Sequence, residues 1–173
     1  MKKIFVISDT HFNHEAILDF ESRSKWFEKD IIRKWNNIVS NDDLVVHLWD
    51  VIFDRPWELK DYLSQMKGTK VLVRWNHDKK SIVSYMNAWF SFVCDEFKFN
   101  QYTWFKIIFS HIPLPNIPDG YYNIHWHIHS WVHRWDIKLS DRHILYNPEK
   151  TWFNLCPVML DNLIKKHLQK YIK

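Results

Sequence analysis

Short apolar segments alternate with helix-like segments along the first half of the chain, and this alternation restricts the possible folds more than any other feature. Strand-like apolar runs occupy residues 3–7, 44–48 and 70–73. Apolar residues at helical spacing, or helix start and stop signals, predict helices over residues 24–38, 56–67 and 80–87. The order strand, helix, strand, helix, strand favours a mainly parallel sheet.

The second half of the chain is richer in strands. Four strand-like segments with short connections cover residues 91–99, 102–110, 122–128 and 142–146, and a final helix is expected over residues 157–172. The two halves are joined without a linker or a repeat. We therefore expect a single α/β domain over residues 1–173, in which two sheets pack face to face.

The bulk composition is ordinary for a soluble globular chain, with 46% apolar and 25% charged residues among 173. The apolar run at residues 4–7 is too short for a signal peptide, and no run approaches the roughly 18 residues of a membrane span. Two cysteines are too few for a disulfide framework. These features predict a cytoplasmic protein with no membrane partner.

Metal-competent side chains follow the predicted strands. They are Asp9 and His11, Asp50, Asn76 and His77, His111, and His127 with His129. The carboxyl ends of strands in open α/β sheets are where ligands bind, so these segments can converge on one place. Each segment alone is also compatible with a turn or a structural histidine. Together they offer mixed oxygen and nitrogen ligands, which suit Mn, Fe, Zn or Ni.

These segments also carry a resemblance to a known family. "SDTHF", "LWDV", "RWNHD", "SHIP" and "HWHIH" match, in order, the five signatures of the calcineurin-like metallophosphoesterases. The resemblance runs from about residue 4 to residue 129 and is closest to the small single-domain bacterial and archaeal members. It implies an α/β fold in four layers, an α-β-β-α sandwich of two mixed sheets flanked by helices.

The resemblance also implies a site with two divalent cations, Mn foremost and Fe, Zn, Ni or Mg as alternatives. Asp9, His11 and His129 would bind the first cation, Asn76, His111 and His127 the second, and Asp50 would bridge both. Metal-bound hydroxide would attack a phosphomonoester or phosphodiester. His77 would be the general acid, with Asp78 orienting its ring.

Two other functions share this fold. One is a non-catalytic metal-binding scaffold. The presence of His77 beside an intact ligand set argues against it, because a scaffold has little need for that histidine. The other is a nuclease. The net charge of +4 and pI near 9.0 suit an anionic substrate, but they equally fit solvated surface lysines. We therefore expect a small phosphoester substrate and do not favour nucleic acid.

Tryptophan stands where the family has glycine. The residues before Asp50, Asn76 and His127 are Trp49, Trp75 and Trp126, and the chain has 2 glycines and 11 tryptophans. An average chain of this length has roughly 12 glycines. Either bulky residues occupy three motif turns, or UGA codons that encode glycine were translated as tryptophan. UGG codons at these three positions would refute the second explanation.

Not every tryptophan fits a glycine position. The tryptophan in "RKWNN", Trp35, matches one that this branch of the family often has. By contrast, Trp57 and Trp89 fall in segments where a turn glycine would be natural. If residue 49 has a positive φ, tryptophan there would be strained, because bulky side chains are rarely found in that conformation.

Overall fold

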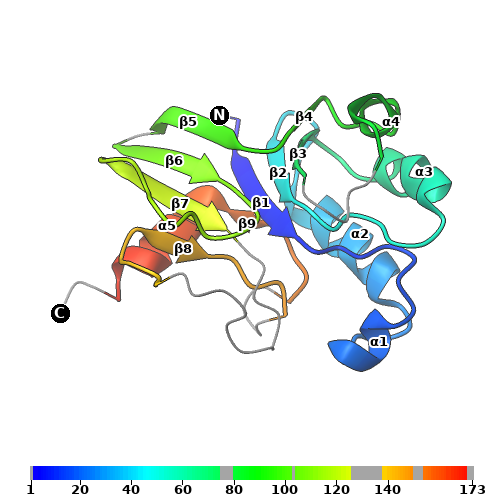
Figure 1. Ribbon diagram of the computed structural model, residues 1–173. Coiled ribbons are helices and arrows are strands. Elements are labelled where there is room, and N and C mark those ends of the chain that lie inside the picture. The colour runs from blue at the N-terminus through cyan, green and yellow to red at the C-terminus, as the bar shows by residue number, and fades with distance from the viewer. Residues whose placement is uncertain (1, 75–79, 103, 126–137, 150–153, 171–173) are drawn as a thin grey trace.

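The structure is a computed structural model that describes residues 2–74, 80–102, 104–125, 138–149 and 154–170 (Figure 1). Two mixed sheets form its centre, in the strand orders β4-β3-β2-β1-β9 and β5-β6-β7-β8. Buried residues of both sheets belong to one hydrophobic core. The predicted class, an α/β chain with two mixed sheets flanked by helices, is confirmed.

The first sheet contains the strands of the alternating half. Its members are β1 (Ile4–Ser8), β2 (Leu44–Leu48), β3 (Thr69–Val73), β4 (Phe92–Cys94) and β9 (Val158–Met159). β1 to β4 pair in parallel, and β9 is antiparallel to β1. Almost every residue of β1, β2 and β3 is buried, as expected for parallel strands covered on both faces.

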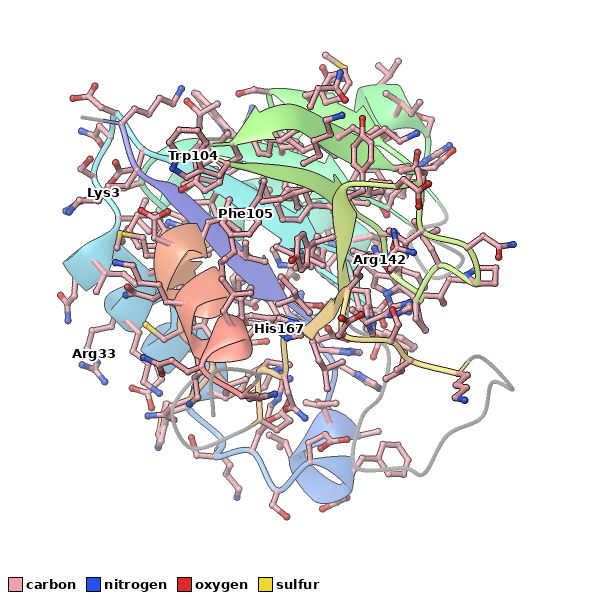
Figure 2. The ribbon with its side chains drawn as sticks, turned by 90° about the vertical axis from the view of Figure 1, so that its left-hand side faces the viewer. Lys3, Arg33, Trp104, Phe105, Arg142 and His167 are labelled. Atoms are coloured by element: carbon pink, nitrogen blue, oxygen red, sulfur yellow. The ribbon has the colours of Figure 1, made fainter. Side chains whose placement is uncertain are left out.

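The second sheet begins with a hairpin and continues in parallel. It consists of β5 (Phe97–Tyr102), β6 (Phe105–Phe109), β7 (Tyr121–His125) and β8 (His143–Leu145). β5 and β6 are antiparallel, whereas β6, β7 and β8 run in parallel. Trp104 lies at the hairpin connection, 96% exposed (Figure 2).

The helices are short and lie around the sheets. They are α1 (Ile17–Phe20), α2 (Phe27–Ile38), the 3-10 turn η1 (Pro56–Glu58), α3 (Leu59–Ser64), α4 (Ile82–Asn87) and α5 (Leu160–Leu168). α2 buries Phe27, Ile31 and Trp35, which recur at helical spacing. α2, α3 and α4 lie together beside the first sheet (Figure 1). α5 packs against β1, β8 and β9.

Two differences from the sequence-based expectation change the assignment of strands. Residues 91–99 are not one strand, because they divide into β4 of the first sheet and β5 of the second. The final helix begins at Leu160 rather than at residue 157, since Val158 and Met159 form the edge strand β9. Among the described residues, no helix is long and apolar enough to cross a membrane.

Candidate metal centre

The site lies at the carboxyl ends of β1 and β2, which are parallel neighbours. Asp9 and His11 follow β1, and Asp50 follows β2 by two residues. Backbone hydrogen bonds continue between the two loops, from Asp9 N to Trp49 O (3.1 Å) and from His11 N to Asp50 O (2.9 Å). The pairing of the two strands therefore fixes the relative position of their polar side chains.

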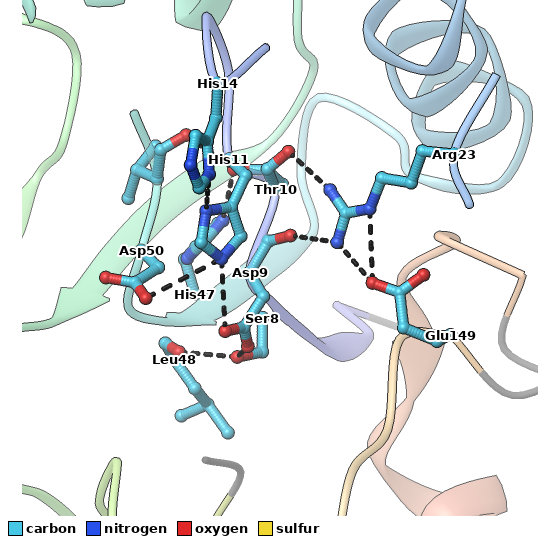
Figure 3. Close-up of polar contacts among 11 residues, drawn as sticks. Ser8, Asp9, Thr10, His11, His14, Arg23, His47, Leu48, Asp50 and Glu149 are labelled. Atoms are coloured by element: carbon cyan, nitrogen blue, oxygen red, sulfur yellow. Dashed lines mark hydrogen bonds and ion pairs between the residues drawn. The ribbon is translucent and has the colours of Figure 1, made fainter. Parts of the chain in front are cut away.

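Asp9, His11 and Asp50 form a buried cluster that could hold a cation (Figure 3). His11 Nε2 lies 3.6 Å from Asp9 Oδ1 and 3.6 Å from Asp50 Oδ2. One ligand atom from each residue lies within 4.8 Å of the others. Two ligand atoms held about 2.0–2.2 Å from a common metal ion are at most about 4.4 Å apart, and the two separations of 3.6 Å lie within this limit. Two carboxylates and an imidazole are also a donor set that Mn, Fe or Zn accepts.

The cluster has an unusual backbone. Asp9, His11 and Asp50 have φ angles of 53°, 50° and 44°. Asp, Asn and His are the non-glycine residues most often found in this left-handed region, but each such residue still costs roughly 1–3 kcal/mol. The surrounding structure must therefore hold these residues in place, and strained backbone of this kind is concentrated at functional sites.

Side chains of the same loops support the cluster. The Ser8 hydroxyl bonds to the Asp9 carboxylate and to Leu48 O, the latter at 2.7 Å. Thr10 Oγ1 donates to Val51 O at 2.9 Å and lies 3.1 Å from His47 Nε2. Because the hydroxyl proton of Thr10 goes to Val51, His47 Nε2–H is the donor in the second contact. Burial, with a smaller effect of His11, lowers the pKa of His47 to about 3, so this imidazole is neutral.

Two aromatic rings form the rim beside His11. His14 Nδ1 lies 2.9 Å from His11 Nδ1, and the His14 ring stacks on Phe53 with centroids 4.0 Å apart and planes 8° apart. Phe53 is 42% exposed. His14 therefore contacts a metal-competent histidine directly.

His111 approaches from the second sheet, after β6. Its ring is buried against the indole of Trp49, with centroids 3.0 Å apart and planes 24° apart. Carbon atoms prefer separations of about 3.5–4.0 Å, so the two rings are compressed. Trp49 thus occupies space next to an expected metal ligand.

Trp49 also has a glycine-like backbone. Its φ is 76° and that of Trp89 is 78°, close to 83° for Gly68 and 77° for Gly120. The other non-glycine residues with positive φ lie between 44° and 58°. A φ near +80° is the conformation for which turns use glycine. Residue 49 thus has the positive φ under which strain was expected for a tryptophan, whereas Trp57 lies in η1 and has no positive φ.

The structure brings Asp9, His11 and Asp50 together as predicted. The remaining predicted residues of the site, Asn76, His77, Asp78, His127 and His129, lie outside the described residues. His125, at the end of β7, is fully buried and packs edge-on against His143. Burial lowers the pKa of His125 to about 3, so it is neutral.

Sequence reasoning missed three polar residues that organise the site. Asn13 bonds to Arg55, Glu58 and Tyr62 through its side chain, and Asn123 bonds to Ile108, Leu114 and Ser110, the residue before His111. Arg23 binds the backbone of Asp9 and Thr10. Arg23 and Asn123 bond mainly to backbone groups, and the side-chain partners of Asn13 lie more than 40 positions away, so none of the three leaves a spaced motif in the sequence.

Comparison with known proteins gives the fold but not the activity. No family model matches the chain. An uncharacterised protein of Methanocaldococcus jannaschii is 29% identical over 181 residues, covering 95% of this chain and 91% of that protein. The fold is shared with a protein of unknown function from Aquifex aeolicus, with a TM-score of 0.73, 24% identity, and coverage of 96% of this chain and 100% of that one.

A solved nuclease, MPE of Pseudomonas putida, has a similar but more distant structure. Its TM-score is 0.50 at 15% identity, over 73% of this chain and 61% of the nuclease. At this identity the similarity concerns the fold alone. The candidate cation site therefore depends on the geometry of Asp9, His11 and Asp50.

Proposed function

We propose that the chain is a metal-dependent phosphoesterase that holds two divalent cations, Mn foremost, and hydrolyses a phosphomonoester or phosphodiester. One observation carries the proposal: two buried carboxylates and an imidazole gather at the ends of adjacent parallel strands. Burying two carboxylates is costly unless they are paired or bind a metal. A structural role alone would not require this arrangement.

When bound, the cations would stabilise negative charge on phosphoryl oxygens and lower the pKa of a bound water. The chain itself prepares His11 for such a role. For Nε2 to face a cation with its lone pair, the His11 proton must sit on Nδ1 and be donated to His14 Nδ1, 2.9 Å away. With a cation bound, His14 would thus fix the tautomer of His11, as partners of metal-ligating histidines commonly do.

The remaining roles rest on the resemblance of the motifs. Asn76, His111 and His127 would complete the second cation site, and His129 the first. His77 would protonate the leaving oxygen, with Asp78 orienting its ring. With tryptophan at position 49, the indole presses on the His111 ring. We therefore propose that the Trp49→Gly chain is the more active form.

The proposal is tested with an aryl phosphodiester and an aryl phosphomonoester in the presence of Mn²⁺, Ni²⁺, Zn²⁺ or Mg²⁺. We expect metal-dependent turnover that is faster in Trp49→Gly and absent in Trp49→Gly with Asp50→Asn. Adding His77→Ala to Trp49→Gly should lower the rate by about 10²–10⁴-fold, the usual contribution of a general acid. A folded Trp49→Gly chain that binds Mn²⁺ without any turnover would instead favour a metal-binding scaffold.

The same assay separates small substrates from nucleic acids. DNA is included because a nuclease shares the fold. We expect small phosphoesters to be hydrolysed with little dependence on salt. Preferential DNA cleavage, with binding that weakens steeply as salt rises, would identify a nuclease.

A further inference from the structure

Arg23 lies behind the candidate metal centre and binds the backbone that carries it. Its side chain is 1% exposed. Nη2 donates to the carbonyl oxygen of Asp9 at 2.8 Å, and Nη1 donates to that of Thr10 at 3.0 Å. Figure 3 shows the guanidinium and the His11 ring on opposite sides of this backbone. Arg23 thus contacts the loop without approaching the cation site itself.

Glu149 holds the guanidinium in this position. Arg23 Nε donates to Glu149 Oε1 at 3.1 Å, and Nη2 bonds to the same oxygen. The Glu149 side chain is 19% exposed, so the ion pair is largely removed from water. The Phe27 ring lies below the guanidinium, 5.2 Å from its carbon. A buried charge paired in this way has one defined orientation.

The backbone around Asp9 needs donors of this kind. The N–H groups of Asp9, His11 and Phe12 point toward the loop after β2 and bond to Trp49 O, Asp50 O and Val51 O. The carbonyl groups of Asp9 and Thr10 bond to Arg23 instead. Buried carbonyl groups require partners, and a left-handed backbone persists only where its surroundings hold it.

We infer that Arg23, held by Glu149, is a positioning residue that fixes the metal-binding carboxylate of Asp9 and the imidazole of His11. The inference rests on the proposed function, because it requires a cation at this cluster. Arginine suits the position because its planar fork reaches two successive carbonyl oxygens while Nε binds a carboxylate. Lysine has the same charge but cannot make these three contacts with one geometry.

The test measures Mn²⁺ affinity by titration calorimetry, well below the melting temperature, in four full-length chains. They are the parent chain, Arg23→Lys, Glu149→Gln and Lys34→Met. Arg23→Lys keeps the charge and removes the fork, so a change reports geometry. Lys34→Met is the matched control, because Lys34, in α2, also bonds to the C-terminal part of the chain, through Asn154, but has no bond to the metal loop.

We expect Arg23→Lys to weaken Mn²⁺ binding by about 10–100-fold, the usual effect of losing a residue that orients metal ligands. Lys34→Met should bind like the parent chain. The visible absorption of the Co²⁺-saturated protein should also change in Arg23→Lys, because it reports the geometry of the ligands. A purely structural role would alter the melting temperature and leave both the Mn²⁺ affinity and the Co²⁺ spectrum of the folded protein unchanged, and that result overturns the inference.

Two further outcomes are decisive. If Arg23→Lys does not fold, Glu149→Gln decides, since it leaves the guanidinium in place and removes the negative charge of the side chain that holds it. We then expect at least about threefold weaker Mn²⁺ binding, and parent-like affinity overturns the inference. If the parent chain binds no Mn²⁺ saturably, the four chains are compared in the Trp49→Gly background, and if that background binds none either, the proposed function fails and the inference with it. If all four chains bind Mn²⁺ with equal affinity, the inference fails and the proposed function stands.

Discussion

Two fully buried tryptophans lie in regions that differ in almost every physical respect. Trp35 lies in the interior of α2, packs within the apolar core, and donates from Nε1 to Lys67 O at 2.8 Å. Trp49 follows β2, has a φ of 76°, and presses on His111 with ring centroids 3.0 Å apart. Equal burial therefore does not mean equal fit.

The surroundings of Trp35 serve the stability of the fold, whereas those of Trp49 belong to the candidate functional site. The α2 region is apolar, and its helix spacing, burial and hydrogen bond all favour the same residue. The β2 end gathers Asp9, His11, His47 and Asp50 in a buried space, much of it on left-handed backbone. Such local conflicts are expected at functional sites. A glycine at position 49 would remove one conflict and leave the metal-binding groups.

The largest expected effect concerns Trp35. Trp35→Ala should lower the free energy of unfolding by about 3–5 kcal/mol, because it removes a fully buried ring and leaves a cavity. Urea unfolding measures this loss. Trp26→Ala is the control, since Trp26 is exposed, and should change stability by no more than about 1 kcal/mol. Equal losses in the two variants would remove the distinction between the regions.

A smaller effect concerns His47, at the β2 end. Its pKa in the folded protein is about 3, below the ordinary value of 6.5, so between these values the unfolded chain binds one more proton. Stability from this residue is therefore complete above pH 6.5 and is lost as pH falls, by up to about 1.4 kcal/mol per pH unit. In His47→Gln this part of the slope should vanish between pH 6.5 and 5, measured by urea unfolding. An unchanged slope would contradict the assignment.

The smallest expected effect concerns Trp89, which shares the φ of Trp49 but is exposed. Trp89→Gly should raise the free energy of unfolding by about 1 kcal/mol, because it relieves a left-handed bulky residue without opening a cavity. Trp57→Gly is the matched control, since Trp57 is exposed without a positive φ. It should be neutral or destabilising, and a gain equal to that of Trp89→Gly would exclude φ as the cause.

Much of the fold followed from local pattern. The range of β2 matched its expected bounds, because its residues are nearly all apolar and follow a polar pair, Asp42 and Asp43. The division of residues 91–99 between two sheets could not be predicted, since both halves have strand-like composition and the choice of partner strand depends on tertiary packing. β9 has two residues and merges with the helical pattern of α5.

Of the candidate site, only the metal-binding residues could be predicted from the sequence. Asp9, His11 and Asp50 follow strands, and parallel pairing brings strand ends together. Arg23 and Glu149 could not be found in this way, because they are 126 positions apart and act on backbone carbonyls and on each other. The compression between Trp49 and His111 likewise depends on how the two sheets meet.

The central claim is that Asp9, His11 and Asp50 bind a divalent cation and that the backbone at position 49 suits glycine rather than tryptophan. The most direct measurement is Mn²⁺ titration calorimetry of the parent chain, Trp49→Gly, and Trp49→Gly with Asp50→Asn. We predict about tenfold tighter binding in Trp49→Gly, because without the indole that presses on His111 this imidazole can move to the cation, and about 1.4 kcal/mol of extra stabilisation in the bound state gives that factor. The double variant should lose this binding. Saturable binding unaffected by Asp50→Asn, or binding in none of the three chains, would contradict the account.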